Sequence, residues 1–205
     1  MKRSEINQVI RDAQACFAKN MWSLQPNPKW DVTDFGLGNF SKNGLVLINL
    51  ADEEEYCEKL MFAKQNQCTP AHCHKIKKED IICRKGTLEI KCWQDEILNP
   101  GTRMLLKING VKKEVTAGVP VLLQSGERIT LPQGVYHEFQ PLSEECIIGE
   151  VSTANDDIND NYFVNQNIGR FTNIEEDEPE EEKNVSGNFI SFENFLFTII
   201  HLLLQ

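Results

Sequence analysis

The chain of 205 residues has little positive charge and no apolar segment long enough to cross a membrane. Lysine and arginine number 21 against 31 acidic residues, and they form no stripe, so we expect no nucleic-acid partner. No apolar run of the kind found in secretory signals follows the opening Met-Lys-Arg-Ser-Glu. The most apolar stretch, residues 195–204, is shorter than the roughly 20 residues that a membrane helix needs. We therefore expect a cytoplasmic protein with no membrane partner.

Paired cysteine motifs are also missing. The seven cysteines are odd in number and irregularly spaced, which is typical of reduced thiols in a cytosolic protein. Cys68 and Cys73 lie beside two histidines, His72 and His74, so a zinc site is an alternative there. No Cys-x-x-Cys pair completes such a site, and in an extended segment Cys73 points away from both histidines.

Size and composition predict one soluble domain. Apolar residues make up 40% of the chain and charged residues 25%, as in ordinary globular proteins. Residues 175–183 hold seven acidic residues and one lysine, and so account for six of the ten net negative charges. Such a run is usually solvated, and we assign it no chemistry.

The hydrophobic pattern predicts one helix followed by many short strands. Ser4 is placed to cap a helix over residues 5–19, with apolar residues at helical spacing. Residues 20–43 are rich in proline, glycine and tryptophan and predict a loop-rich segment that can lie across a barrel mouth. About eleven short strands favour a barrel or a sandwich. The predicted strands cover residues 45–50, 56–63, 71–74, 80–83, 87–93, 103–108, 112–116, 119–123, 128–131, 137–140 and 146–151.

Two of the four histidines stand one residue apart in Thr69–Gly86. If this segment is extended, His72 and His74 project to the same face. Glu79 follows five residues later, before an apolar run, and can return a carboxylate from the next strand. Two imidazole nitrogens and one anionic oxygen suit a divalent metal. A surface pair without a metal is the alternative for an isolated His-x-His motif.

A second segment places a third histidine beside turn signals. From Gly126 the chain alternates like a strand, reaches Pro132 and Gly134, and then His137. Three of the four histidines thus lie in two strand-rich segments next to turns, which favours a shared metal site.

These two segments resemble the two cupin motifs. The first motif is matched by His72, His74, Glu79 and Gly86, and the second by Gly126, Pro132, Gly134 and His137. Asn66 and Pro141 depart from the usual glycine and asparagine at the motif ends. The resemblance implies a small antiparallel β-barrel, jelly-roll-like and mainly β, with an N-terminal helix. It also implies one metal bound inside by His72, His74, Glu79 and His137, and pairing into a homodimer.

A third segment narrows the resemblance to the D-lyxose isomerase family. Glu150 lies inside an apolar strand and is followed by a loop of acids and amides, although burying a lone carboxylate is costly. The matching segments lie within residues 1–178 and include 1–7, 34–40, 58–61, 72–82, 149–157 and 169–178. The resemblance implies a Mn²⁺-dependent isomerase that interconverts D-lyxose and D-xylulose, and also D-mannose and D-fructose.

The resemblance also implies the roles of further residues. Lys77 and Glu150 would be the acid–base pair that moves a proton between C1 and C2 of a small-molecule sugar; an ion pair that only lines the cavity is the alternative. Asp156, Asp157 and Arg170 would either contact sugar hydroxyls or fix the loop. An iron oxygenase or a non-catalytic sugar-binding module is the alternative function, and neither needs a positioned base.

We divide the chain into three parts. Residues 1–43 form a helix and loop packed on the barrel, residues 44–174 the cupin barrel, and residues 175–205 an acidic run with an atypical apolar tail. The tail is either an appendage or the product of a reading-frame change, and its histidine, His201, is not counted as a ligand.

Overall fold

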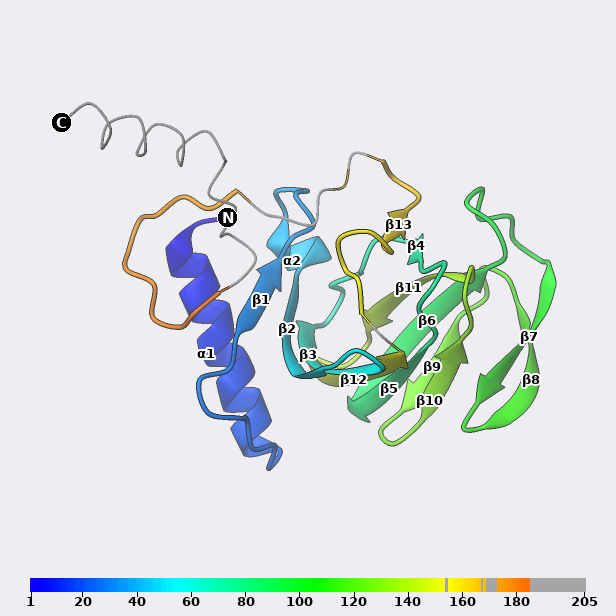
Figure 1. The fold of residues 1–205 in the computed structure, drawn as a ribbon, viewed down its shortest axis with the longest axis horizontal. Coiled ribbons are helices and arrows are strands. Elements are labelled where there is room, and N and C mark those ends of the chain that lie inside the picture. The colour runs from blue at the N-terminus through cyan, green and yellow to red at the C-terminus, as the bar shows by residue number, and fades with distance from the viewer. Residues whose placement is uncertain (154, 167, 169–172, 185–205) are drawn as a thin grey trace.

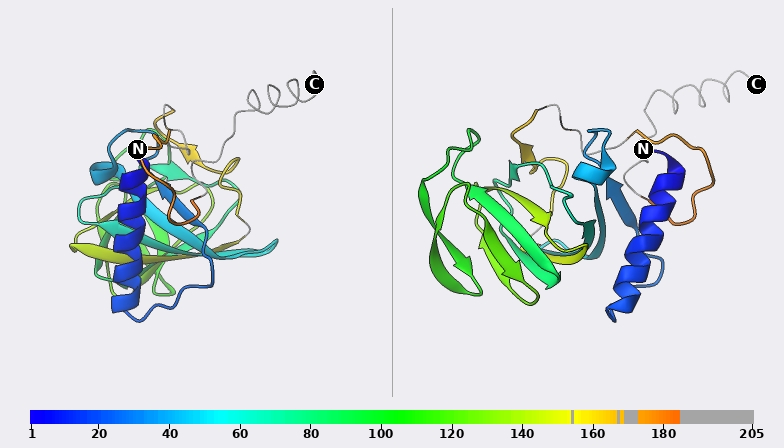
Figure 2. Two further views of the ribbon diagram at one scale, coloured as in Figure 1. Left: turned by 90° about the vertical axis from the view of Figure 1, so that its left-hand side faces the viewer. Right: turned by 180° about the vertical axis from the view of Figure 1, so that it is seen from behind.

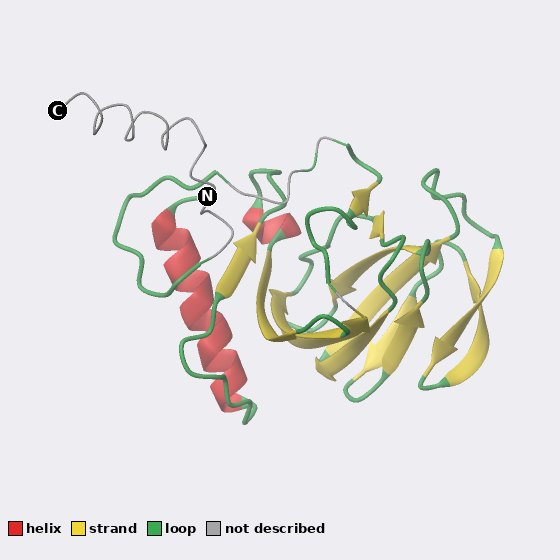
Figure 3. Ribbon diagram, viewed as in Figure 1, coloured by secondary structure: helices red, strands yellow, loops and turns green. Residues whose placement is uncertain are grey.

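The structure of the protein, a computed structural model, describes residues 1–153, 155–166, 168 and 173–184. Two antiparallel sheets form a cupin-type barrel, and one long helix lies against its outside, as Figures 1 and 3 show. The mainly β fold with an N-terminal helix is therefore confirmed. In the part of the chain just given, no helix is long and apolar enough to cross a membrane.

The strands fall into a large and a small sheet. The large sheet has the order β1-β2-β3-β12-β5-β10-β7-β8, and the small sheet has the order β13-β4-β11-β6-β9. The helices are α1 (Arg3–Lys19) and α2 (Phe40–Asn43). The strands are β1 (Trp30–Thr33), β2 (Leu45–Asp52), β3 (Tyr56–Lys64), β4 (His72–Cys73), β5 (Glu79–Lys85), β6 (Thr87–Trp93), β7 (Arg103–Ile108), β8 (Val111–Thr116), β9 (Val121–Gln124), β10 (Arg128–Leu131), β11 (Tyr136–Pro141), β12 (Glu145–Thr153) and β13 (Tyr162–Phe163).

All eleven predicted strands are present, and two short ones are additional. β1 pairs with β2 inside the segment predicted as loop-rich, and α2 follows it; neither short element was predicted. β13 adds a two-residue edge to the small sheet by pairing with β4. β13 has only two residues, which are too few for a periodic pattern to show in the sequence.

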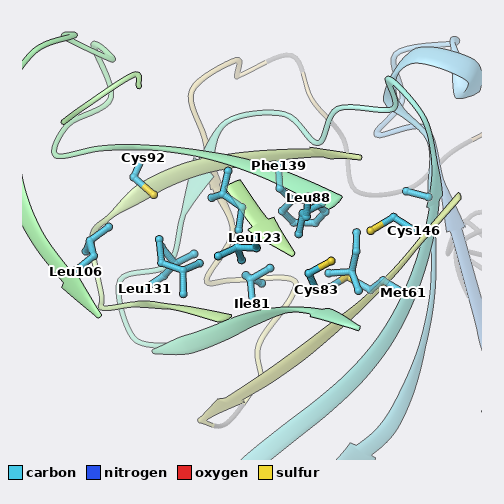
Figure 4. Close-up of a cluster of buried hydrophobic side chains, with 14 of the residues drawn as sticks. Met61, Ile81, Cys83, Leu88, Cys92, Leu106, Leu123, Leu131, Phe139 and Cys146 are labelled. Atoms are coloured by element: carbon cyan, nitrogen blue, oxygen red, sulfur yellow. The ribbon is translucent and has the colours of Figure 1, made fainter. Parts of the chain in front are cut away.

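The inner core lies between the two sheets, where every second residue of a strand points inward. Ile81 and Cys83 of β5 meet Ile148 of β12 and Leu88 of β6 in this cluster, which Figure 4 shows in part. Leu123 of β9 is also fully buried there. All seven cysteines are free thiols, as predicted.

A second core lies on the outside of the large sheet, under α1. Ile6, Ile10 and Phe17 of the helix contact the outward side chains of the sheet, including Phe62 of β3 and Ile147 of β12. β3 and β12 are therefore buried on both faces. Figure 2 shows α1 outside the barrel, next to β1.

The start of α1 differs from the prediction. The helix begins at Arg3, and the carboxylate of Glu5 accepts a hydrogen bond from the backbone N–H of Lys2 at 2.9 Å. Ser4 lies inside the first turn instead of capping it. Its hydroxyl donates to the carboxylate of Asp177 at 2.7 Å.

The acidic run of residues 175–183 is not simply solvated, so that prediction is also wrong. The segment, orange in Figure 1, lies along α1. Arg3 is 5% exposed, and its guanidinium binds Glu176 at 2.7 Å and Glu180 at 3.2 Å. Asn7 donates to Glu178 at 2.7 Å, and Arg11 lies 2.6 Å from a carboxylate oxygen of Glu181. The run therefore supplies partners for the polar face of the helix.

Candidate metal centre and its lysine–carboxylate network

Three histidine rings meet inside the barrel. His72 of β4 is the direct cross-strand partner of His137 of β11, and their ring centroids are 4.4 Å apart. His74 follows β4 on the same face, with its centroid 5.1 Å from that of His72. Ligand nitrogens of all three lie within 4.8 Å of one another, which makes them a group able to bind a divalent metal.

Hydrogen bonds to backbone carbonyls determine the tautomer of each ring. A carbonyl oxygen only accepts, so each Nδ1 must carry the proton and each Nε2 a lone pair. The acceptors are the carbonyl oxygens of Pro70 for His72 at 2.8 Å, of Asp160 for His74 at 2.6 Å and of Val135 for His137 at 3.1 Å. Such a bond from the second ring nitrogen is typical of histidines that bind metals.

Glu79 adds a carboxylate to the three histidines. Its Oε1 lies 3.0 Å from Nε2 of His137 and 3.5 Å from Nε2 of His74. Among the described residues this buried oxygen has no hydrogen-bond donor. Lone pairs of oxygen and nitrogen therefore face each other, an arrangement that a bound cation would make favourable. The four side chains fit a divalent metal in donor type: the three histidines form the compact group, and the carboxylate of Glu79 lies beside two of them.

The electrostatic environment of His72 and His74 favours their neutral rings, whose nitrogens are free to bind a metal. Burial and the neighbouring rings hold the pKa of His72 well below its ordinary value, and burial lowers the pKa of His74. Neutral imidazole is the form that binds metals. Burial alone would raise the pKa of Glu79, but the ammonium group of Lys77 outweighs this and holds the pKa well below the ordinary value.

A glycine turn joins the two motif segments. Gly134 has a φ of 78°, a left-handed conformation that glycine adopts without steric cost, and its N–H donates to the carbonyl of His74 at 2.7 Å. Asn66, which replaces a motif glycine, also has a positive φ of 68°, and asparagine tolerates this region. The departure at Asn66 is therefore compatible with the cupin backbone.

Lys77 and Glu150 lie beside the metal-binding group. Nζ of Lys77 is 2.8 Å from Oε1 of Glu150 and 3.1 Å from Oε2 of Glu79. Burial alone would lower the pKa of Lys77, but the two carboxylates outweigh it and raise the pKa. The ammonium group is thus fully charged and lies between a candidate ligand and a candidate base.

Lys59 is a site residue that the sequence analysis missed. Its side chain is 4% exposed, and Nζ lies 3.0 Å from Asp157 and 3.5 Å from Oε1 of Glu150. Asn155 accepts a further hydrogen bond from it at 2.9 Å. Its position in β3, two residues before the inward-facing Met61, could have indicated that Lys59 also points into the barrel.

The other predicted sugar-contacting residues divide into three cases. Asp157 lines the cavity and binds Lys59 through both carboxylate oxygens. Asp156 is exposed and bonds to Asn159 of its own loop, so the structure does not bring it to the site. Arg170 lies outside the described residues, as does His201.

The cavity beside the metal-binding group has one polar and one apolar wall. Phe163 of β13 lies with its ring centroid 5.3 Å from that of His72, and Phe35 packs edge-on against Phe163. Phe35 comes from the segment between β1 and α2, so part of residues 20–43 reaches the cavity. The lining residues include Thr33, Phe35, Leu45, Leu47, Lys59, Met61, His72, His74, Lys77, Glu79, His137, Phe139, Glu150, Asp157, Asn161 and Phe163. The alternative zinc ligands, Cys68 and Cys73, are not among them.

Comparison with known proteins identifies relatives. Residues 25–187 match the family model described as D-lyxose isomerase. The D-lyxose/D-mannose isomerases of Escherichia coli O157:H7 and Serratia proteamaculans are each 34% identical to the chain, and each alignment covers 87% of the chain and 94% of the relative. A solved structure of Cellulomonas parahominis L-ribose isomerase with L-ribose has a TM-score of 0.63 at 17% identity, covering 85% of this chain and 98% of that one.

The fold and the three-histidine group define a cupin-type barrel able to bind a divalent metal. The chain belongs to the D-lyxose isomerase family. It is accordingly an aldose–ketose isomerase that acts on a small-molecule sugar, and this favours the isomerase interpretation over an oxygenase or a binding module.

Proposed function

We propose that the protein interconverts D-lyxose and D-xylulose, and D-mannose and D-fructose, with the help of one divalent metal. The observation that carries the proposal is the buried Oε1 of Glu79, which faces two histidine nitrogens and has no donor among the described residues. The relatives named D-lyxose/D-mannose isomerase support the choice of sugars.

His72, His74, Glu79 and His137 would bind the metal. A divalent metal supplies Lewis-acid polarisation of neighbouring sugar oxygens when it is bound at such a site. Manganese accepts a mixed set of imidazole and carboxylate ligands, and we propose it as the native ion.

Glu150 is the proposed base. It removes the proton from C2 of the open-chain aldose and returns it at C1. Lys77 and Lys59 both lie near Oε1 of this carboxylate, which leaves Oε2 as the oxygen that takes the proton. Buried between β3 and β5, the carboxylate is held in one orientation by its neighbours.

Lys77 is the proposed acid partner. Lys77 is 3% exposed; its ammonium group donates a proton to the C1 oxygen, on which negative charge develops as the proton leaves C2, and takes one back from the C2 hydroxyl, so that C2 becomes the carbonyl carbon of the ketose. The apolar wall of Phe35 and Phe163 would exclude water from this step, and a low-dielectric site strengthens the electrostatic stabilisation.

The proposal is tested with a panel of sugars and metals. Metal-free protein is supplied with Mn²⁺, Mg²⁺, Zn²⁺ or Fe²⁺ and with D-lyxose, D-mannose or their C2 epimers D-xylose and D-glucose. Ketose formed is measured together with dioxygen consumed. We expect ketose from D-lyxose and D-mannose with Mn²⁺ as the most activating ion. Dioxygen uptake without ketose would instead identify an oxygenase.

We also propose that the protein forms a homodimer. The edge strands β8 and β9 end the two sheets without a partner strand among the described residues, and pairing protects such edges. Light scattering at several protein concentrations checks this, and a monomer at all of them would contradict it.

A further inference from the structure

Asp160 is a buried carboxylate that the proposed chemistry does not use. It lies in the loop between β12 and β13 and is 2% exposed. Its Oδ1 accepts from the backbone N–H of Lys75 at 2.8 Å, and its Oδ2 accepts from that of Lys77 at 2.8 Å. The N–H of Ile76 contacts both oxygens at 3.1 Å. Three consecutive backbone N–H groups thus surround one anion, and hydrogen bonds to a charged acceptor are about twice as strong as neutral ones.

The backbone of the same residue contacts a candidate metal ligand. The carbonyl oxygen of Asp160 accepts the Nδ1 proton of His74 at 2.6 Å, and this bond places the lone pair on Nε2. One residue therefore contacts the side chain of His74 and the backbone of the turn that leads from His74 to Lys77.

The loop of Asp160 contacts the rest of the site as well. Three residues before it, Asp157 binds Lys59, the partner of Glu150. Three residues after it, Phe163 of β13 pairs with His72. Among the described side chains of this loop, the carboxylate of Asp160 is the one bonded to the turn that carries both His74 and Lys77.

We propose that Asp160 is a positioning residue for both halves of the site. It orients Nε2 of His74 for metal binding, and it places Lys77 against Glu79 and Glu150. A carboxylate is required because every group facing its two oxygens is an N–H donor. An asparagine at this position would turn an NH₂ group toward a backbone N–H and lose at least one of these bonds. The inference rests on the proposed function and assigns a specific residue to it.

Asp160→Asn in the full-length chain tests this role. The matched control is Asp95→Asn, because Asp95 also accepts a backbone N–H, that of Ile97 at 3.0 Å, in a loop away from the cavity. Mn²⁺ affinity of the metal-free proteins is measured by calorimetry, and kcat and KM are measured with D-lyxose. We expect Asp160→Asn to bind Mn²⁺ about 10-fold more weakly or worse and to lose kcat at saturating metal. Asp95→Asn should match the wild type.

Two further measurements separate positioning from general stability. The melting temperature of the metal-free form shows whether Asp160→Asn is folded at the assay temperature. Hydrogen exchange on metal-free wild type should show the amides of residues 75–77 protected, although the side chains of Lys75 and Ile76 are exposed. If the Asp160→Asn variant does not fold, the hydrogen exchange of the metal-free wild type tests the inference instead. Unprotected amides at residues 75–77 would then overturn it.

The outcomes also separate the inference from the proposed function. Wild type that neither binds Mn²⁺ nor forms ketose would refute the proposed function. Wild type that does both, together with an Asp160→Asn variant of unchanged Mn²⁺ affinity and kcat, would refute the role of Asp160 alone.

Discussion

Lys59 and Glu150 are direct cross-strand partners on β3 and β12, with Nζ of the lysine 3.5 Å from Oε1 of the carboxylate. Both side chains project from the same face as the core residues Met61 and Ile148. The charged network is thus an extension of the barrel core and is placed by strand register. A register shift of one residue would turn each side chain to the opposite face.

Lys59→Met should destabilise the protein and slow turnover. The substitution keeps an unbranched side chain that is one atom shorter, but it leaves Glu150 and Asp157 without one of their cations. Breaking a buried ion pair in this way costs about 3–5 kcal/mol. Thermal or denaturant unfolding of the metal-free chain measures the first effect, and kcat with D-lyxose measures the second. Unchanged stability and kcat would show that Lys59 contributes nothing to the network.

Lys64→Met is the matched control for this prediction. Lys64 is on the same strand, but its side chain is 46% exposed and its ammonium binds Asp12 at 2.6 Å on the surface. Exposed ion pairs contribute little, so we expect its free energy of unfolding to change by no more than about 1 kcal/mol.

His72→Ala, His74→Ala and His137→Ala should each abolish retention of the metal. Each change removes one ligand nitrogen and leaves an incomplete donor set. Elemental analysis after dialysis measures the bound metal. Cys68→Ser and Cys73→Ser serve as controls and should retain it, because neither thiol belongs to the metal-binding group. Metal loss in the cysteine variants alone would support the zinc alternative.

Glu150→Gln should retain the metal and bind sugar, yet turn over about 10²–10⁴-fold more slowly, because the amide cannot accept the C2 proton. Reaction in deuterated water separates this mechanism from direct hydrogen transfer between the two carbons. With a base on the pathway, ketose formed early should carry deuterium at C1. Absence of deuterium, with a near-normal rate for the variant, would leave Glu150 as a binding residue.

Acidification should release the acidic segment from α1. The Arg3 guanidinium lowers the pKa of Glu176, and the Ser4 hydroxyl lowers that of Asp177. A carboxylate whose pKa is lower in the folded state than in the unfolded state stabilises the fold at pH values above its unfolded pKa. That unfolded pKa is about 4.3 for Glu176 and about 3.9 for Asp177. That stabilisation is lost as pH falls through the lower folded values. Melting temperatures from pH 7 to pH 2 should show this loss in wild type.

Glu176→Gln tests the assignment of that pH dependence. The variant should melt below wild type at neutral pH, and the difference should shrink as pH falls through the folded pKa of Glu176. Arg3→Met removes the partner and should show the same trend. A constant difference between wild type and Glu176→Gln at every pH would contradict the assignment.

The sequence predicted those site residues that stand in a recognisable local pattern of strands and turns. The alternation of a strand was enough to place His72 and His74 on one face, and turn signals marked His137. The complete set of four ligands, with Glu79, came from the resemblance to the cupin motifs. The same alternation found most strands of the barrel. The pair of Lys77 and Glu150 needed the family resemblance, because 73 residues separate them.

The sequence could not predict contacts that depend on distant pairing. A lysine in an apolar strand gives no sign of its partner, so Lys59 was missed. The loop holds three nearby aspartates, and sequence alone does not show that Asp160 rather than Asp156 turns inward. The hydroxyl of Ser4 binds Asp177 instead of capping the helix, and no local pattern indicates a partner 173 residues away.

The candidate ligands come from both sheets of the barrel. His72 of β4, His74 just after it and His137 of β11 belong to the small sheet, whereas Glu79 begins β5 of the large sheet. A bound ion would therefore cross-link the two sheets, and they could not separate without breaking a coordination bond. Metal should then slow the rate of unfolding as well as raise the melting temperature, and its effect on kinetic stability should be greatest where separation of the sheets limits that rate. At a free metal concentration of about 100 times the dissociation constant, the linkage alone contributes about 2.7 kcal/mol.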